Sequence, residues 1–296
     1  MQFDPENLRD FACGNNAVKN EASYRDGVFR ELDAKDITIA AFKVRKCGIP
    51  AGIRALALLL GGEPSGVTEL HRVWRYIAYA CHVRLRYGDW IKAQIDDGIT
   101  QAIDVPSLIM DDAAYALAGA ILFGEDAFAE WLGKRAVAAF QRPEVFGPAF
   151  WQNEPVVPYV LGLFWYWTAM KCGEEPEKFG QIIDELSKDC AKPYYGRLLL
   201  DWKARSFDRH FKKLCDNWGG TGSHEPSPFQ GFPVAILATL LIRQQSNLSI
   251  PDHPLLAHSV CTLPMAGCDG STDPFFDEAN EKLAAIAPTD DVLWQW

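Results

Sequence analysis

Residues 114–140, AYALAGAILFGEDAFAEWLGKRAVAAF, predict two helices joined by a tight turn. The first segment is apolar almost throughout. In the second, Phe128, Trp131, Leu132 and Ala136 recur at intervals of three and four residues, which places them on one face of a helix. The connecting Gly-Glu-Asp combines a residue that ends helices with acids suited to the first turn of the next. Such a helical hairpin cannot bury its apolar face alone, so we expect several hairpins to stack.

The same pattern recurs elsewhere in the chain. Residues 157–187 contain two helical segments separated by Gly173-Glu174-Glu175-Pro176, and residues 37–60 predict a third hairpin that turns at Gly48-Ile49-Pro50. Segment 154–171 is apolar on nearly every face, which predicts a central, buried helix. Further helices are predicted over residues 68–87, 194–218 and 232–245. The prediction is an all-α fold, a single compact domain of stacked antiparallel helical hairpins that spans residues 1–296.

Composition excludes several classes of protein. Apolar residues make up 48% of the chain and charged residues 23%, values typical of a globular protein and not of a disordered one. No stretch reaches the roughly 20 apolar residues that a membrane span needs. The first residues contain neither a basic region nor an apolar one, so we expect no signal peptide. The eight cysteines are scattered, which favours free thiols and a cytoplasmic location.

Charge is unevenly distributed along the sequence. The chain has a formal net charge of −10, which argues against nucleic acid as a partner. Residues 93–190 hold six Lys and Arg against sixteen Asp and Glu, whereas residues 43–92 hold nine against three. If the hairpins stack side by side, the acids at their turns line one rim and attract a basic protein. The alternative is that these acids only keep the protein soluble. The candidate binding residues are Glu125, Asp126, Glu174, Glu175 and Glu177.

Motifs for nucleotide binding, serine hydrolysis and zinc proteolysis do not occur in the sequence. The best metal candidate is the group His253, His258, Cys261 and Cys268, whose side chains are the ligand types that zinc prefers. Their spacing matches neither a zinc finger nor a zinc ribbon, so the sequence favours a surface loop with hydrogen-bonded histidines and buried thiols over a metal site. We therefore predict no catalytic residue, no metal and no cofactor, and keep a metal-dependent helical enzyme as an alternative.

The predicted helix 68–87 has a second face of basic and aromatic residues. Such a stripe can hold a phosphate or a stacked base. Because the surrounding chain is acidic, the sequence favours a solvated face with aromatic shoulders. The stripe consists of Arg72, Arg75, Tyr76, Tyr79, His82 and Arg86.

Two stretches resemble a known family. Residues 116–140 (ALAGAILFGEDAFAEWLGKRAVAAF) and 232–264 (FPVAILATLLIRQQSNLSIPDHPLLAHSVCTLP) resemble the all-helical immunity proteins of bacterial polymorphic toxin systems, most nearly the type called immunity protein 49. The resemblance implies a non-enzymatic protein that binds and blocks a cognate toxin, and it carries over no individual binding residue. The expected function is neutralisation of a basic toxin in the cytoplasm by protein–protein occlusion. A helical scaffold or adaptor without a toxin is the other alternative.

Overall fold

Helices make up all the regular secondary structure that the computed structural model describes, namely in residues 15–99, 108–141, 156–190, 192–220, 232–261 and 273–288. The all-α prediction is confirmed. Internal contacts divide the chain into two compact units. One contains α2, α3, α4 and α14, and the other contains α5, α6 and α9 to α13. That residues 1–296 form a single domain stays a prediction.

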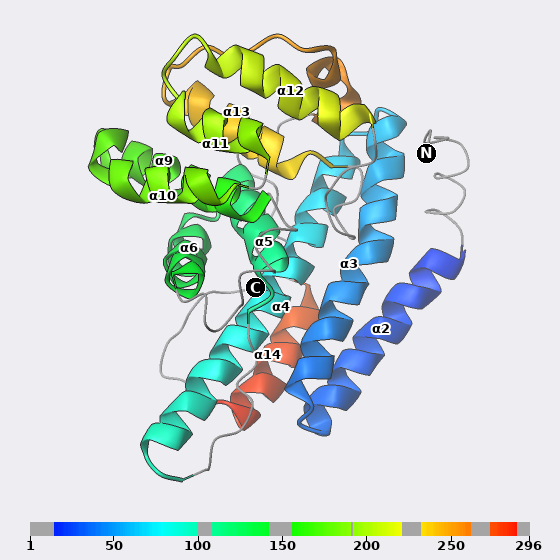
Figure 1. Cartoon of the computed structure of the whole chain (residues 1–296). Coiled ribbons are helices and arrows are strands. Elements are labelled where there is room, and N and C mark those ends of the chain that lie inside the picture. Colours follow the sequence, from blue (N-terminus) through cyan, green and yellow to red (C-terminus); the bar gives the residue numbers. More distant parts are fainter. Residues whose placement is uncertain are drawn as a thin grey trace. The chain divides into compact units, whose positions relative to one another are not determined.

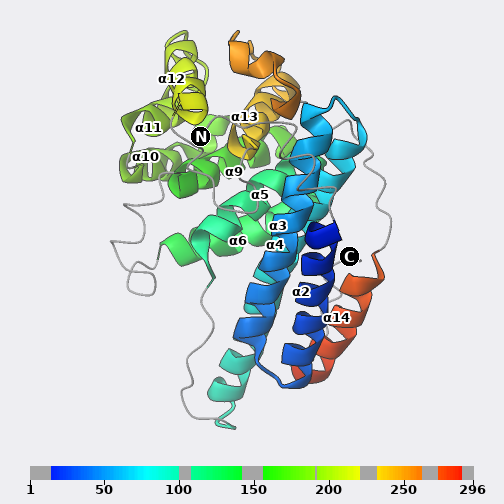
Figure 2. The ribbon, with the colours of Figure 1, turned by 90° about the vertical axis from the view of Figure 1, so that its right-hand side faces the viewer.

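The first unit is built around two long helices. The helices are α2 (Asn15–Asp33), α3 (Ile37–Leu60), α4 (Ser65–Asp96) and α14 (Pro274–Ile286). Helix α3 packs against both α2 and α4, and α14 lies along α2 (Figures 1 and 2). Asp36 caps α3, since its carboxylate accepts a hydrogen bond of 3.0 Å from the backbone N–H of Ile39.

Helix α3 corrects the prediction of a third hairpin. It runs without a break through Gly48-Ile49-Pro50, where the sequence predicts a turn. A proline inside a helix costs about 3 kcal/mol because it removes a backbone hydrogen bond. Here Gly48 and Pro50 are both buried, in a helix that packs between α2 and α4. The apolar surface buried along α3 offsets the local cost, which turn chemistry alone does not reveal.

The second unit has α9 at its centre. Helix α9 contacts α5, α6, α10, α11 and α13 (Figure 1). The α-helices of this unit are α5 (Met110–Phe123), α6 (Asp126–Phe140), α9 (Val156–Cys172), α10 (Gly180–Asp189), α11 (Pro193–Leu200), α12 (Phe207–Gly220) and α13 (Val234–Gln245). Its 3-10 helices are η1 (Pro176–Phe179), η2 (Pro254–Ala257) and η3 (Ser259–Cys261). The hairpins α5–α6 and α9–α10 are therefore where the sequence predicts them.

Helix α9 is buried on most of its faces, as its apolar sequence predicts. Val160, Leu161 and Phe164 are at most 1% exposed. Trp165 is only partly covered, and its ring stacks on Phe179 at a centroid distance of 4.8 Å. Three of these four residues therefore belong to the core, as the predicted burial of the helix requires, and Trp165 lies at its edge.

The predicted helix over residues 194–218 is wrong, because the chain forms α11 and α12 with a turn between them. The buried Arg243 of α13 explains this break. Its guanidinium donates to the carbonyl oxygens of Trp202 and Ser249, and it lies over the Phe207 ring, 3.7 Å from the ring centroid. A buried guanidinium needs such acceptors, and a free carbonyl at Trp202 requires the chain to leave the helical path.

Two further predictions concern the cysteines and membrane-spanning helices. The cysteines in the described ranges are free thiols, and Cys13 and Cys268 lie outside those ranges. Among the described helices, none combines the length and apolar character that crossing a lipid bilayer requires.

Candidate functional site

The two acidic turns close in the same way. Gly124 and Gly173 follow the last residues of α5 and α9 with φ of +77° and +65°, a conformation that glycine adopts without strain. The next residue then donates its N–H back to the helix: Glu125 to Ala120 O at 2.9 Å, and Glu174 to Ala169 O at 2.8 Å. This hydrogen bond ends each helix, and the acidic residues follow directly after the glycine.

An ion pair brings the two turns together. Lys171, near the end of α9, places its ammonium 2.6 Å from the carboxylate of Asp126 at the start of α6. Asp126, Glu175 and Glu177 are exposed, while Glu125 and Glu174 are half-buried. The five predicted residues thus lie at two neighbouring hairpin turns, which we call the acidic rim. That the acidic rim binds a toxin stays a prediction.

Lysines neutralise part of the charge of the acidic rim. Lys178 pairs with Glu174 at 2.5 Å, and Lys203 lies 2.7 Å from Glu175 and 3.2 Å from Glu177. The pKa of Glu177 lies below its usual value because a backbone hydrogen bond and Lys203 favour the ionised form. Because these pairs lie at the surface, solvent screens them and they exchange readily with a partner's charges.

A cleft of about 480 Å³ adjoins the acidic rim. Glu177 and Lys203 line it together with the apolar side chains of Tyr166, Leu200 and Trp202. Tyr166 and Trp202 stack at a centroid distance of 4.2 Å, and Leu200 is 47% exposed. An apolar hollow bordered by charges is the arrangement that protein interfaces use for an anchoring side chain.

The His/Cys group of the metal alternative is only partly described, since Cys268 lies outside the described residues. His253 uses both ring nitrogens: Nδ1 accepts from Leu255 N–H at 3.1 Å, and Nε2 lies 3.0 Å from the Asp216 carboxylate. His258 Nδ1 faces the N–H of Val260 at 3.4 Å, and Cys261 is buried. Within the described part of the chain, no three His, Cys, Asp or Glu side chains are grouped as metal ligands. His253 would have to break one of its bonds to ligate an ion.

A buried polar cluster in the first unit escaped sequence analysis. Glu21, whose side chain is only 7% exposed, accepts from Tyr76 Oη at 2.7 Å and pairs with Arg54 at 2.5 Å and Arg72 at 2.9 Å. Asp273, which caps α14, pairs with Arg25. We call this the arginine–carboxylate cluster: Glu21, Arg25, Arg54, Glu69, Arg72, Tyr76 and Asp273.

The arginine–carboxylate cluster has a structural role. Its three guanidinium groups match its three carboxylates, so it offers no surplus charge to a ligand. It joins α2, α3, α4 and the segment that begins α14, because its members come from all four. No local pattern predicts it, since Arg25 and Asp273 are 248 positions apart in the sequence.

The basic and aromatic face of α4 also differs from the prediction. Arg75, Tyr79, His82 and Arg86 are buried and not solvated. Arg86 donates to Ala287 O at 2.9 Å and to Asn280 Oδ1 at 3.0 Å. The guanidinium of Arg75 lies 4.6 Å from the centroid of the Phe276 ring. Long arginine stems and aromatic rings cover apolar surface well, and α14 supplies partners that the sequence near α4 does not show.

Comparison with protein-family models, with curated proteins and with solved structures finds no significant match to this chain.

Proposed function

We propose that this protein is an immunity protein that binds a cognate toxin in the cytoplasm and neutralises it by covering its active surface. The observation that carries the proposal is the acidic rim, where the Lys171–Asp126 pair places two acidic turns side by side. The resemblance of residues 116–140 and 232–264 to helical immunity proteins points to the same function. No catalytic residue, metal or cofactor takes part in this proposal.

The surface chemistry suits a basic partner. Exposed carboxylates at the edge of an interface attract an oppositely charged protein and accelerate its association. The lysines of the acidic rim hold these carboxylates only through exposed ion pairs, which a partner's arginines and lysines can replace. Apolar contacts in the adjoining cleft would then slow dissociation.

The direct test uses the protein encoded by the neighbouring gene. Its expression alone should arrest growth, co-expression with this chain should restore growth, and the two purified proteins should form a complex. Because occlusion consumes one binding protein per toxin, inhibition should be stoichiometric. Absence of a complex with that toxin would contradict the proposal, and protection far below one equivalent would favour an enzyme instead. A chelator added during the assay separates a metal-dependent enzyme from simple binding.

A further inference from the structure

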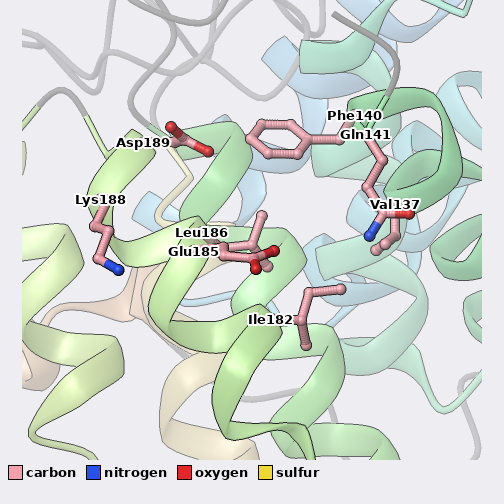
Figure 3. A pocket seen from close by; sticks show the side chains of 8 residues that line it. All are labelled: Val137, Phe140, Gln141, Ile182, Glu185, Leu186, Lys188 and Asp189. Atoms are coloured by element: carbon pink, nitrogen blue, oxygen red, sulfur yellow. The ribbon is translucent and has the colours of Figure 1, made fainter.

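A second hollow in the second unit is lined by two carboxylates that form no ion pair with a described residue. It measures about 400 Å³ and lies between the end of α6 and α10. We call it the α6–α10 groove. Its walls are Val137, Phe140, Gln141, Ile182, Glu185, Leu186, Lys188 and Asp189 (Figure 3).

Two carboxylates stand at this groove on the same face of α10. Glu185 and Asp189 are four residues apart, so they lie one helical turn from each other, and Figure 3 shows both beside the space that Phe140 faces. Within the described residues neither carboxylate forms an ion pair, although Glu185 accepts a hydrogen bond of 3.2 Å from Gln181 Nε2 and helps Asp184 to raise the pKa of Lys188. Lys188 is bonded to Asp184 at 2.5 Å, and in Figure 3 its ammonium lies away from the space between Phe140 and Asp189.

This arrangement costs stability. Like charges at positions i and i+4 of a helix repel each other, and Asp189 is the last residue of α10, where the helix dipole disfavours a negative charge. Burial and the neighbouring Glu185 raise the pKa of Asp189. The contrast with the acidic rim is clear, because there Asp126, Glu174, Glu175 and Glu177 each have a lysine.

We propose that the α6–α10 groove receives an arginine or lysine side chain of the basic toxin. The apolar stem lies along Phe140 and Ile182, and the cationic end meets Glu185 and Asp189. Apolar walls with a paired negative charge at one side fit such a side chain better than any neutral or acidic one. The Phe140 ring adds an aromatic face to which a cation is attracted. The inference rests on the proposed function and identifies where that toxin is held.

The test uses p-aminobenzamidine, a cation on an apolar ring, and its neutral analogue 4-aminobenzamide, with binding followed by ligand-detected NMR. Wild-type protein should bind the cation, and the neutral amide should bind at least about tenfold more weakly. The double variant Glu185→Gln/Asp189→Asn should lose about tenfold or more in affinity for the cation. The matched control Asp277→Asn/Glu281→Gln removes the same charge from two exposed positions four residues apart on α14 and should bind as the wild type does.

Three results would overturn the inference: no binding of the cation by wild-type protein, equal binding of the neutral amide, or equal loss in the two double variants. Arg142 follows Gln141 in the sequence and lies outside the described residues. If Arg142→Gln were needed for the probe to bind, the chain's own arginine would be the occupant, and the inference would also fail. The affinity of the toxin for the two double variants is then measured, and only Glu185→Gln/Asp189→Asn should bind the toxin more weakly than wild type. If the toxin does not bind wild-type protein while the probe does, the proposed function fails and the cation-binding groove stands.

Discussion

The ring of Phe164 on α9 lies directly against the backbone of Gly133 on α6. A Cβ atom added at residue 133 would stand 2.4 Å from Cε2 of that ring. Glycine therefore sets how closely α6 approaches the central helix of its unit.

Gly133→Val should destabilise the protein by about 1–3 kcal/mol, because overpacking forces either the ring or the helix to move. The free energy of unfolding in urea measures the effect. Phe164→Ala alone should cost about 3–5 kcal/mol, and in that background the valine should cost much less, since the ring is gone. Gly180→Ala is the matched control: nothing lies within 4 Å of its Cβ position, so it should not destabilise. A valine tolerated equally in both backgrounds would contradict the contact.

Glu21→Gln should destabilise the protein by about 3–5 kcal/mol, the usual effect of breaking a buried ion pair and leaving its partner charged. Arg54 and Arg72 would keep their charges with one fewer carboxylate beside them. Asp126→Asn serves as the control, because its pair with Lys171 is exposed and should be worth at most about 1 kcal/mol. Thermal and urea unfolding measure the stability of both variants. Equal losses would show that the ion pairs of the arginine–carboxylate cluster are worth no more than an exposed pair.

A fall in pH should lower the stability of the first unit, because Asp273 becomes protonated. Burial alone would raise the pKa of this carboxyl, but hydrogen bonds from Arg25 and from the Phe275 N–H outweigh burial and hold the pKa below its usual value of 3.8. An acid with a lowered folded pKa contributes stability above its unfolded pKa, and that contribution is lost as pH falls through the folded pKa. Asp273→Asn should therefore be less stable at neutral pH and lose less stability than wild type below about pH 4. Parallel pH profiles of the two proteins would contradict this.

Asp189→Asn should stabilise the protein by about 0.2–0.5 kcal/mol at neutral pH, because it removes a like charge one turn from Glu185. The pKa of Asp189 is raised by burial and then by Glu185, so its ionised form opposes folding at neutral pH, and the penalty disappears as pH falls below the folded pKa. Asp184→Asn is the control, since it removes the partner of Lys188 and should bring no gain. Urea unfolding curves give the free energy of unfolding of both variants. A loss of stability in Asp189→Asn would contradict the prediction, because it would mean that the Asp189 carboxylate forms a stabilising interaction.

Reversal of Glu174 and Glu175 to lysine should slow association with the toxin and flatten the dependence of the rate on salt, with the fold unchanged. Exposed charges at an interface edge act mainly on the association rate. Stopped-flow measurements at several ionic strengths compare the variant with wild type, and circular dichroism checks its helix content. Identical association rates and salt dependences would show that the acidic rim is not part of the interface with the toxin.

Local chemistry in the sequence predicted α5, α6, α9 and α10 and the two glycine turns that join them in pairs. The intervals of apolar residues in 126–140 and the Gly-acid pairs at 124–125 and 173–174 act within one or two turns of chain, so they can be recognised without the fold. The apolar character of α9 likewise predicted that Phe164 is buried. The acidic rim followed from the same turns.

Tertiary structure alone decided the remainder, because the partners involved are far apart in the sequence. Helix α3 continues through Pro50 since it packs between α2 and α4, and the chain breaks after α11 where Arg243 binds Trp202 O. The arginine–carboxylate cluster needs residues 21 and 273 in one place, and the α6–α10 groove exists only because Phe140 and α10 line the two sides of one hollow. Burial and ion pairing depend on distances in space, which sequence spacing specifies only within a helix or a turn.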